Sequence, residues 1–291
     1  MESATRGDCL VTPAAAASEP RPAFSGHLRL VAAVDADGRT QLAEQSFRAP
    51  FHISKPYWDG AVLQVQVVNP TAGILAGDRL ELDIAAGRGA ALLVTTPAAA
   101  RAFMMRHGAA ACRQVFTVRD GAWLEYLPEP LYPHRDADYA QATRLEVEAG
   151  GEAVFFDALA PGRIGRGERW AWRRLRVSLD VHYAGEPVLR ECLDAGGPEM
   201  AAAAELHRTP DAFFGTMVLM TERLRADDPV WDAVRTRHGG GRWIGATALR
   251  RGGWVVRVIA PGGQALRDTV AELRSLFSAA LPRLASDLRK L

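Results

Sequence analysis

Hydrophobic residues alternate with polar or small residues in many short runs, and this period of two is typical of β-strands with one buried face. In residues 62–68, Leu63, Val65 and Val67 fall on one side, while Gln64 and Gln66 fall on the other. Comparable runs occupy residues 28–32, 80–84, 91–95, 114–118, 123–127, 144–149, 153–159, 175–181, 216–221, 244–249 and 254–260. The pattern predicts a mainly β protein.

Turn-forming residues separate these runs. Residues 35–38 (Asp-Ala-Asp-Gly) and 250–253 (Arg-Arg-Gly-Gly) fit hairpin turns, because glycine tolerates positive φ. Glycine also marks the connections at residues 86–89, 120–121 and 149–151. Since no long helix separates the runs up to about residue 195, we expect an antiparallel meander rather than alternating strands and helices.

Helical signals lie near the C-terminal end. Asp228 and Pro229 suit the start of a short helix, and Gly239 suits its end. From Gln264 onward, apolar residues recur at helical spacing until Pro282, which ends or kinks the run: Leu266, Val270, Leu273 and Phe277. The sequence predicts a helical pair or a kinked helix over residues 264–291.

Composition supports one folded domain with an N-terminal tail. Hydrophobic residues make up 48% of the chain and charged residues 24%, values that are ordinary for a globular protein. Residues 1–22 contain alanine-rich and proline-rich polar stretches with no apolar face, so we expect them to be disordered. Residues 23–291 are expected to form a single β-rich domain.

The charge balance and the cysteines limit the partners and the compartment. The 35 Lys and Arg residues offset 34 Asp and Glu residues, so the formal net charge of +1 favours neither nucleic acid nor an anionic membrane. No signal peptide or membrane span is predicted. Cys9, Cys112 and Cys192 are far apart, which argues against a disulfide framework or a structural zinc site and favours the cytoplasm.

Motifs for common catalytic chemistry are missing from the sequence. There is no Gly-x-Ser-x-Gly and no P-loop lysine, and the seven histidines are isolated. His134-Arg135-Asp136 lacks the other motifs of a kinase, and the glycines at 239–241 follow a predicted helix instead of preceding one. The arginines around Trp170 and Trp172 fit a packed strand with an interface role better than a nucleic-acid surface.

Several short motifs, taken in order, resemble the UreD family of urease accessory proteins, also called UreH. They are Gly77-Asp78, Thr95-Thr96 with Ala98-Ala99, residues 121–128 (Gly-Ala-Trp-Leu-Glu-Tyr-Leu-Pro), Gly162-Arg163 and Gly167-Glu168. The likeness runs from about Phe24 to Leu281. Pro97 and Glu129 depart from the glutamines that the family commonly has at these places, and the glycine cluster before Gly77 is reduced.

The resemblance implies an elongated, β-helix-like or stacked-sheet scaffold with a few short helices and a C-terminal helical segment. It implies a non-enzymatic metallochaperone scaffold that serves nickel insertion into the urease apoprotein, in a complex with urease accessory protein F and the GTPase called protein G. Nickel is then a transient cargo and not a tightly bound cofactor. Two alternatives stay open: a β-rich enzyme whose site forms only in three dimensions, and a generic protein-binding module.

The resemblance also directs attention to particular residues. A nickel path needs weak, exchangeable ligands, so Asp78, Glu125 and Asp157 are expected near it. Thr95 and Thr96 are expected as hydroxyl partners, and Arg163 with Glu168 as an orienting or interface ion pair. The structural alternatives are that Asp78 caps its turn and that Glu125 faces solvent.

Local propensity and family likeness disagree over residues 96–103. Thr96-Pro97 is a good helix start, followed by alanines, which are poor strand formers. The UreD-like reading expects an extended segment instead. Both conformations stay open for this segment, and the extended one is preferred.

Overall fold

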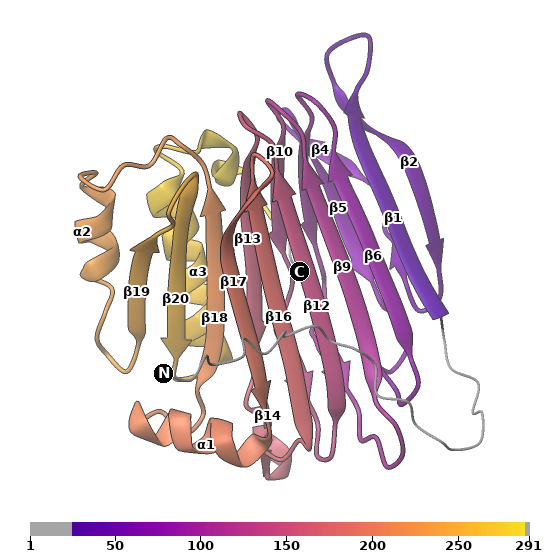
Figure 1. The fold of residues 1–291 in the computed structure, drawn as a ribbon, viewed down its shortest axis with the longest axis vertical. Coiled ribbons are helices and arrows are strands. Elements are labelled where there is room, and N and C mark those ends of the chain that lie inside the picture. The colour runs from indigo at the N-terminus through magenta and orange to yellow at the C-terminus, as the bar shows by residue number, and fades with distance from the viewer. Residues whose placement is uncertain (1–24, 289–291) are drawn as a thin grey trace, which may run out of the picture.

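The computed structural model describes residues 25–288, which form two stacked β-sheets with one group of helices on an outer face and a further helix at one end (Figure 1). The chain passes repeatedly from one sheet to the other, as in a β-solenoid. Only three α-helices occur within this range, one of them near the C-terminal end. The mainly β scaffold with few helices is confirmed, whereas the tail expected at residues 1–22 lies outside the described residues.

The first sheet contains seven strands. They are β1 (Ser25–Val34), β2 (Thr40–Arg48), β6 (Arg79–Ala86), β9 (Ala110–Val118), β12 (Asp138–Val147), β16 (Arg174–Tyr183) and β17 (Glu186–Ala195). Their order across the sheet is β17-β16-β12-β9-β6-β1-β2.

The second sheet contains eleven strands. They are β3 (His52–Ile53), β4 (Tyr57–Asp59), β5 (Val62–Val68), β7 (Ala91–Thr95), β8 (Ala100–Ala102), β10 (Trp123–Leu127), β11 (Leu131–Pro133), β13 (Glu152–Leu159), β18 (Phe213–Met220), β19 (Trp243–Ala248) and β20 (Gly253–Ala260). Their main path is β19-β20-β18-β13-β10-β7-β5-β3, to which β4, β8 and β11 attach.

The remaining elements are short apart from the C-terminal helix. They are the hairpin of β14 (Gly162–Arg163) and β15 (Glu168–Arg169), the 3-10 helices η1 (Ile164–Arg166) and η2 (Pro282–Ala285), and the helices α1 (Gly197–Leu206), α2 (Val230–Arg235) and α3 (Gly263–Phe277). Figure 1 shows α3 behind β18 and β20, and α1 across the lower end of the body.

The central strands of both sheets run parallel, so the predicted antiparallel meander is wrong for them. β1, β6, β9, β12 and β16 are parallel neighbours in the first sheet. β5, β7, β10 and β13 are parallel neighbours in the second. Parallel neighbours need a crossover connection, and here a strand of the opposite sheet provides it. Antiparallel pairing occurs toward the ends of the sheets, for example between β1 and β2 and between β13 and β18.

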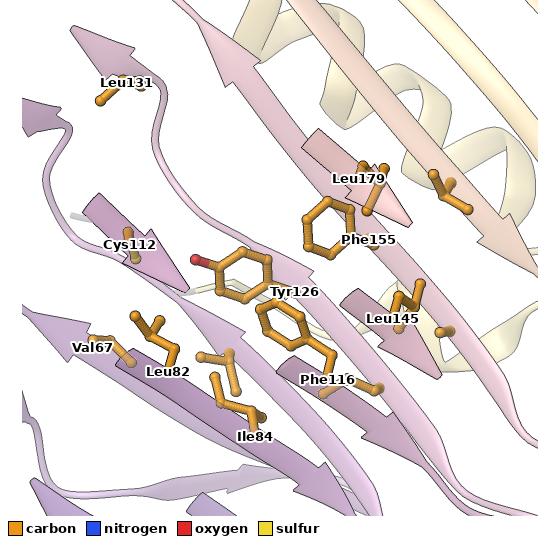
Figure 2. Packing of buried hydrophobic residues seen from close by; sticks show 14 of the residues in the cluster. Val67, Leu82, Ile84, Cys112, Phe116, Tyr126, Leu131, Leu145, Phe155 and Leu179 are labelled. Carbon is orange, nitrogen blue, oxygen red and sulfur yellow. The ribbon is translucent and has the colours of Figure 1, made fainter. Parts of the chain in front are cut away.

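Two apolar layers hold this arrangement together. Between the sheets, the rings of Phe116, Tyr126 and Phe155 pack with centroids 4.6 to 5.4 Å apart (Figure 2). Between the second sheet and the helices, Trp231 of α2 contacts Phe277 of α3. Because both faces of the second sheet are covered, β7 and β10 are buried along their whole length, which is typical of parallel sheets.

Several local predictions are confirmed. The turn at residues 35–38 connects β1 to β2, and the Asp35 carboxylate accepts hydrogen bonds from the backbone N–H groups of Asp37 and Arg39. The turn at residues 250–253 connects β19 to β20. The segment after Thr96 is extended and includes β8, so the helical alternative for residues 96–103 is wrong.

Two features were not foreseen. Helix α1 has an alanine-rich sequence with a weak apolar stripe, so its periodicity gave no signal. Cys112 is a free, buried thiol, whereas Cys192 on β17 is disulfide-bonded. The sequence argued against a framework of disulfides, and it gave no indication that Cys192 would be oxidised.

None of the helices in residues 25–288 combines the length and the apolar character needed to cross a bilayer.

Candidate functional site

The space between the sheets opens where two central strands of the second sheet end early. β7 and β10 have five residues each, whereas β9 and β12 of the first sheet have nine and ten. Beyond Thr95 and Leu127 the chain leaves the ladder. The chain returns to the sheet as β8 and β11, and between the paired segments the loops at residues 96–99 and 128–130 leave the ladder, so a cavity forms beneath them.

Two cavities meet in this region. The first, of about 140 Å³, is lined by polar groups of both sheets, namely Cys112, Gln114, Tyr126, Tyr139, Gln141 and Asp157. The second, of about 460 Å³, lies toward β16, β17 and β18 and is lined by Leu179, Glu191, Met200, Thr216 and Arg257 among others. Gln141, Asp157 and Leu131 line both cavities, so the cavities adjoin at these residues.

Asp157 is the carboxylate at this junction. It lies on β13 with the same parity as Phe155, so it faces the first sheet. Its Oδ2 accepts a hydrogen bond of 2.7 Å from Nε2 of Gln141, and its Oδ1 accepts one of 2.9 Å from the backbone N–H of Ala158. Both partners are neutral groups, so these two hydrogen bonds do not balance the negative charge of the Asp157 carboxylate.

Burial raises the pKa of Asp157 to about 6, against the lowering effect of its two hydrogen bonds. Burial also raises the pKa of Cys112 to about 11, so this thiol is protonated at neutral pH. The pKa values of Tyr126 and Tyr139 are raised for the same reason. Of these four groups, Asp157 is the one that changes charge near neutrality.

Other carboxylates line the outer parts of the cavities. Glu129 lines the first cavity, and its Oε2 lies 3.9 Å from Nη1 of Arg267. Glu191 of β17 lines the second cavity and forms an ion pair with Arg257 of β20. The outer carboxylates are thus accompanied by arginines, whereas the carboxylate at the junction has a neutral amide as its side-chain partner.

The paired threonines hold the loops that cover the first cavity. Thr95 is fully buried, and its hydroxyl donates a hydrogen bond of 2.6 Å to the carbonyl of Leu127. Thr96 lines the cavity, and its hydroxyl accepts a hydrogen bond of 2.8 Å from the N–H of Glu129. These bonds connect the exits of β7 and β10 just beyond their ladder.

Asp78 lies in the turn before β6. Its Oδ2 accepts a hydrogen bond of 2.8 Å from the N–H of Leu75, and the side chain is buried. It does not line either cavity. The structure therefore supports the turn-capping alternative for this residue.

Glu125 lies on the opposite face of the second sheet from the cavity. It is fully buried and accepts hydrogen bonds of 2.6 and 3.1 Å from Nε and Nη2 of Arg274 on α3. The solvent-facing alternative for Glu125 is wrong, because α3 covers this position. Arg274 also donates to the carbonyl of Ser286 at 3.3 Å, so the pair fixes the C-terminal segment on the sheet.

Arg163 and Glu168 form the expected ion pair across the β14–β15 hairpin. The guanidinium donates bonds of 2.8 and 2.6 Å to the two carboxylate oxygens. These bonds lower the pKa of Glu168 despite its partial burial. The pair lies beside buried His134, whose pKa is lowered by burial and then by Arg163. Neither member of the pair lines the two cavities.

Gln141 and Glu191 were missed by sequence reasoning. Tyr139, Gln141 and Thr143 share the interior parity of Leu145 on β12, so they interrupt an otherwise apolar face. Polar residues at positions expected to be buried are a usable signal, but the strand itself was expected to begin only at residue 144. Within residues 25–288, no three His, Cys, Asp or Glu side chains cluster as a metal site.

These features define a class of protein: a two-sheet β-solenoid with polar groups at the junction of its inner cavities and helices over one outer face. The chain matches the family model of the UreD urease accessory protein over residues 25–289. It therefore belongs to the UreD family of urease accessory proteins.

Individual relatives agree with the family model. The chain is 50% identical over 270 residues to the urease accessory protein UreD of Opitutus terrae. The matched region covers 92% of this chain and 99% of the relative. It is 32% identical over 252 residues to the UreD of Deinococcus radiodurans, covering 84% and 88%. It is 28% identical over 261 residues to the UreD of Alkalilimnicola ehrlichii, covering 89% and 88%.

The Glu125–Arg274 pair is predicted to be required for stability. Glu125→Ala leaves a buried guanidinium without its counter-ion, which should lower the free energy of unfolding by about 3–5 kcal/mol. The double variant Glu125→Leu with Arg274→Met should recover most of this loss, because both charges are removed together. Urea denaturation measures each value. Asp232→Ala, which removes an exposed ion pair with Arg235, is the control and should change stability by less than about 1 kcal/mol.

Asp157 is predicted to destabilise the fold at neutral pH. With a folded pKa of about 6 and an ordinary value of 3.8, the folded state retains a proton that the unfolded state has released between about pH 4 and pH 6. Stability therefore falls as the pH rises through this window. Asp157→Asn should be more stable than the wild type by about 1–3 kcal/mol at pH 7.5, and the difference should vanish near pH 4. Denaturation curves at several pH values measure the free energy of unfolding of both proteins, and an equal difference at every pH would contradict this prediction. Glu191→Gln is the control.

Proposed function

We propose that this protein is an accessory factor for nickel insertion into the urease apoprotein and not itself a catalyst. In this proposal it works in the cytoplasm in a complex with urease accessory protein F and, through it, the GTPase protein G. Membership of the UreD family and the names of its relatives as urease accessory proteins support the urease connection. The contribution that we assign to this chain is a path for the cation between its two sheets.

The observation that carries the proposal is the Asp157 carboxylate at the junction of the two cavities. A partly buried negative charge with a neutral amide as its side-chain partner attracts a cation, because the reduced dielectric around it weakens screening. Glu129 and Glu191 line the cavities on either side of it, and each lies beside an arginine. Of these three carboxylates, Asp157 is the one whose side-chain partner is neutral, so it is the one that we assign to the cation.

The ligand chemistry suits transfer better than storage. Carboxylate, amide and water oxygens bind nickel more weakly than imidazole or thiolate groups do. Cys112 also lines the first cavity, but its raised pKa keeps it as a thiol, and the thiolate is the form that binds metals well. A cation in this cavity would therefore meet ligands that exchange readily.

Asp157→Asn should lower the nickel content of urease by about tenfold at limiting nickel, because the cavity junction loses its charge while the side chain keeps its size. The measurement is metal analysis and activity of urease purified from cells that co-express the apoprotein, this chain and proteins F and G. Asp194→Asn, which removes an exposed carboxylate paired with Arg174, is the matched control. Fully metallated urease from the Asp157→Asn cells would exclude the cavity as the path.

Protons should compete with nickel at the junction. Because the pKa of Asp157 is about 6, Ni²⁺ binding to the purified chain should weaken as the pH falls from 7.5 to 5, with a midpoint near pH 6. Isothermal titration calorimetry in non-chelating buffers measures this. In Asp157→Asn the binding that remains should be weak and nearly independent of pH over this range, and a wild-type profile without a step near pH 6 would contradict the assignment.

A further inference from the structure

We propose that Gln141 is a switch at the junction of the two cavities: by turning over its side-chain amide, it converts Asp157 from a hydrogen-bonded carboxylate into half of a two-oxygen cation site. This inference rests on the function proposed above and assigns the residue that controls passage. The ligand is a divalent cation held transiently between Asp157 and the Gln141 carbonyl oxygen.

The position of Gln141 makes it the point of control. It lies on β12 of the first sheet, next to Cys112 of β9, and it lines both cavities. Its Nε2 donates to Oδ2 of Asp157 on β13 of the second sheet at 2.7 Å. This hydrogen bond spans the gap between the sheets where the cavities adjoin. While it is in place, the side chains of both residues occupy the junction.

The Gln141 amide can present either its NH₂ group or its carbonyl oxygen to the Asp157 carboxylate. The presence or absence of a cation at the junction decides which group it presents. Without a cation, the carboxylate favours the N–H donor, because turning the amide would bring two acceptor oxygens together. With a divalent cation beside Asp157, the N–H end is repelled and the carbonyl oxygen becomes a ligand. Cation binding and amide orientation are therefore coupled, since the cation binds one orientation better than the other.

Tyr139 allows the amide to turn without losing its second partner. Its hydroxyl donates to Oε1 of Gln141 at 3.2 Å in the present orientation. A hydroxyl can donate or accept, so the same group can accept from Nε2 after the turn. Both ends of the Gln141 amide thus keep a partner in both states, and the released hydroxyl proton can turn toward the Cys112 sulfur, with which Tyr139 also interacts.

Gln114 provides a matched comparison within the same cavity. It lies on β9, lines the first cavity, and bonds to Thr143 and to Cys112. Neither partner is a carboxylate. Because neither neighbour of Gln114 is charged, no charge favours one orientation of its amide. A cation at Asp157 should therefore leave the orientation of the Gln114 amide unchanged.

The site requires an amide at residue 141, and this requirement can be measured. In calorimetric titration of the purified full-length chain with Ni²⁺, Gln141→Met keeps the length of the side chain but removes the ligand oxygen, so affinity should fall about tenfold. Gln141→Glu adds a second carboxylate and should bind Ni²⁺ more tightly and release it more slowly. Gln114→Met should match the wild type.

Direct observation of the amide tests the switch itself. In protein labelled with ¹⁵N-glutamine, saturation with diamagnetic Cd²⁺ should shift the side-chain NH₂ resonances of Gln141, assigned by their loss in Gln141→Met. Those of Gln114 should stay in place. Wild-type affinity in Gln141→Met, an unmoved Gln141 signal at saturation, or no binding by the wild-type chain at millimolar cation would each overturn the switch.

Failure of the switch can be told apart from failure of the proposed function. If Asp157→Asn loses Ni²⁺ binding and urease loading while Gln141→Met retains both, the path stands and the switch is wrong. If Asp157→Asn retains both, the path itself is wrong and the switch falls with it.

Discussion

The mismatch in strand length between the two sheets is the constraint on which the candidate site depends. Where strands of both sheets face one another, large side chains such as Phe116 and Phe155 fill the interior. Between the ends of β7 and β10 and the starts of β8 and β11, loops replace the ladder, and large side chains do not fill the interior there. The space that remains is lined by side chains with hydrogen-bonding groups, and buried polar groups are stable only when they find partners. Gln114, Thr143, Tyr139, Gln141 and Asp157 supply these partners to one another.

The segment from Trp123 to Leu127 connects the interior to the outer layer. Leu124 and Tyr126 face the first sheet, whereas Trp123 and Leu127 face the helices, as the period of two requires. Glu125 also faces the helices and holds Arg274 of α3. The C-terminal segment is held further by Gln64, whose amide donates to the carbonyl of Asp287 at 2.8 Å. The cavity wall and the helical layer therefore share one five-residue strand.

The sequence was most informative about single strands and least informative about how they pair. The runs at residues 62–68, 91–95 and 123–127 match β5, β7 and β10 at both ends, because period-two alternation is a local property. Parallel pairing was missed, because the same alternation arises whether the next strand joins the same sheet or the opposite one. The site was predicted only in part for a related reason. Asp157 lies at the cavity junction, but Gln141 and Glu191 reach the cavities from another sheet, and only the tertiary arrangement shows that.

Two carboxylates of the second sheet with different partners indicate how structural and functional roles divide in this protein. Glu125 is matched with a guanidinium that donates two bonds, an arrangement in which both charges are satisfied and neither has capacity for another cation. Asp157, about 30 residues further on in the next strand of the same sheet, is matched with a neutral amide. An arginine at position 141 would offset the cost of that partly buried charge, but it would also fill the junction with a permanent cation. A glutamine satisfies the carboxylate only through a hydrogen bond that a stronger partner can displace. The Asp157 charge that is expected to lower stability is thus also what allows the junction to accept a cation. A stability cost of this kind beside an accessible cavity is typical of functional sites.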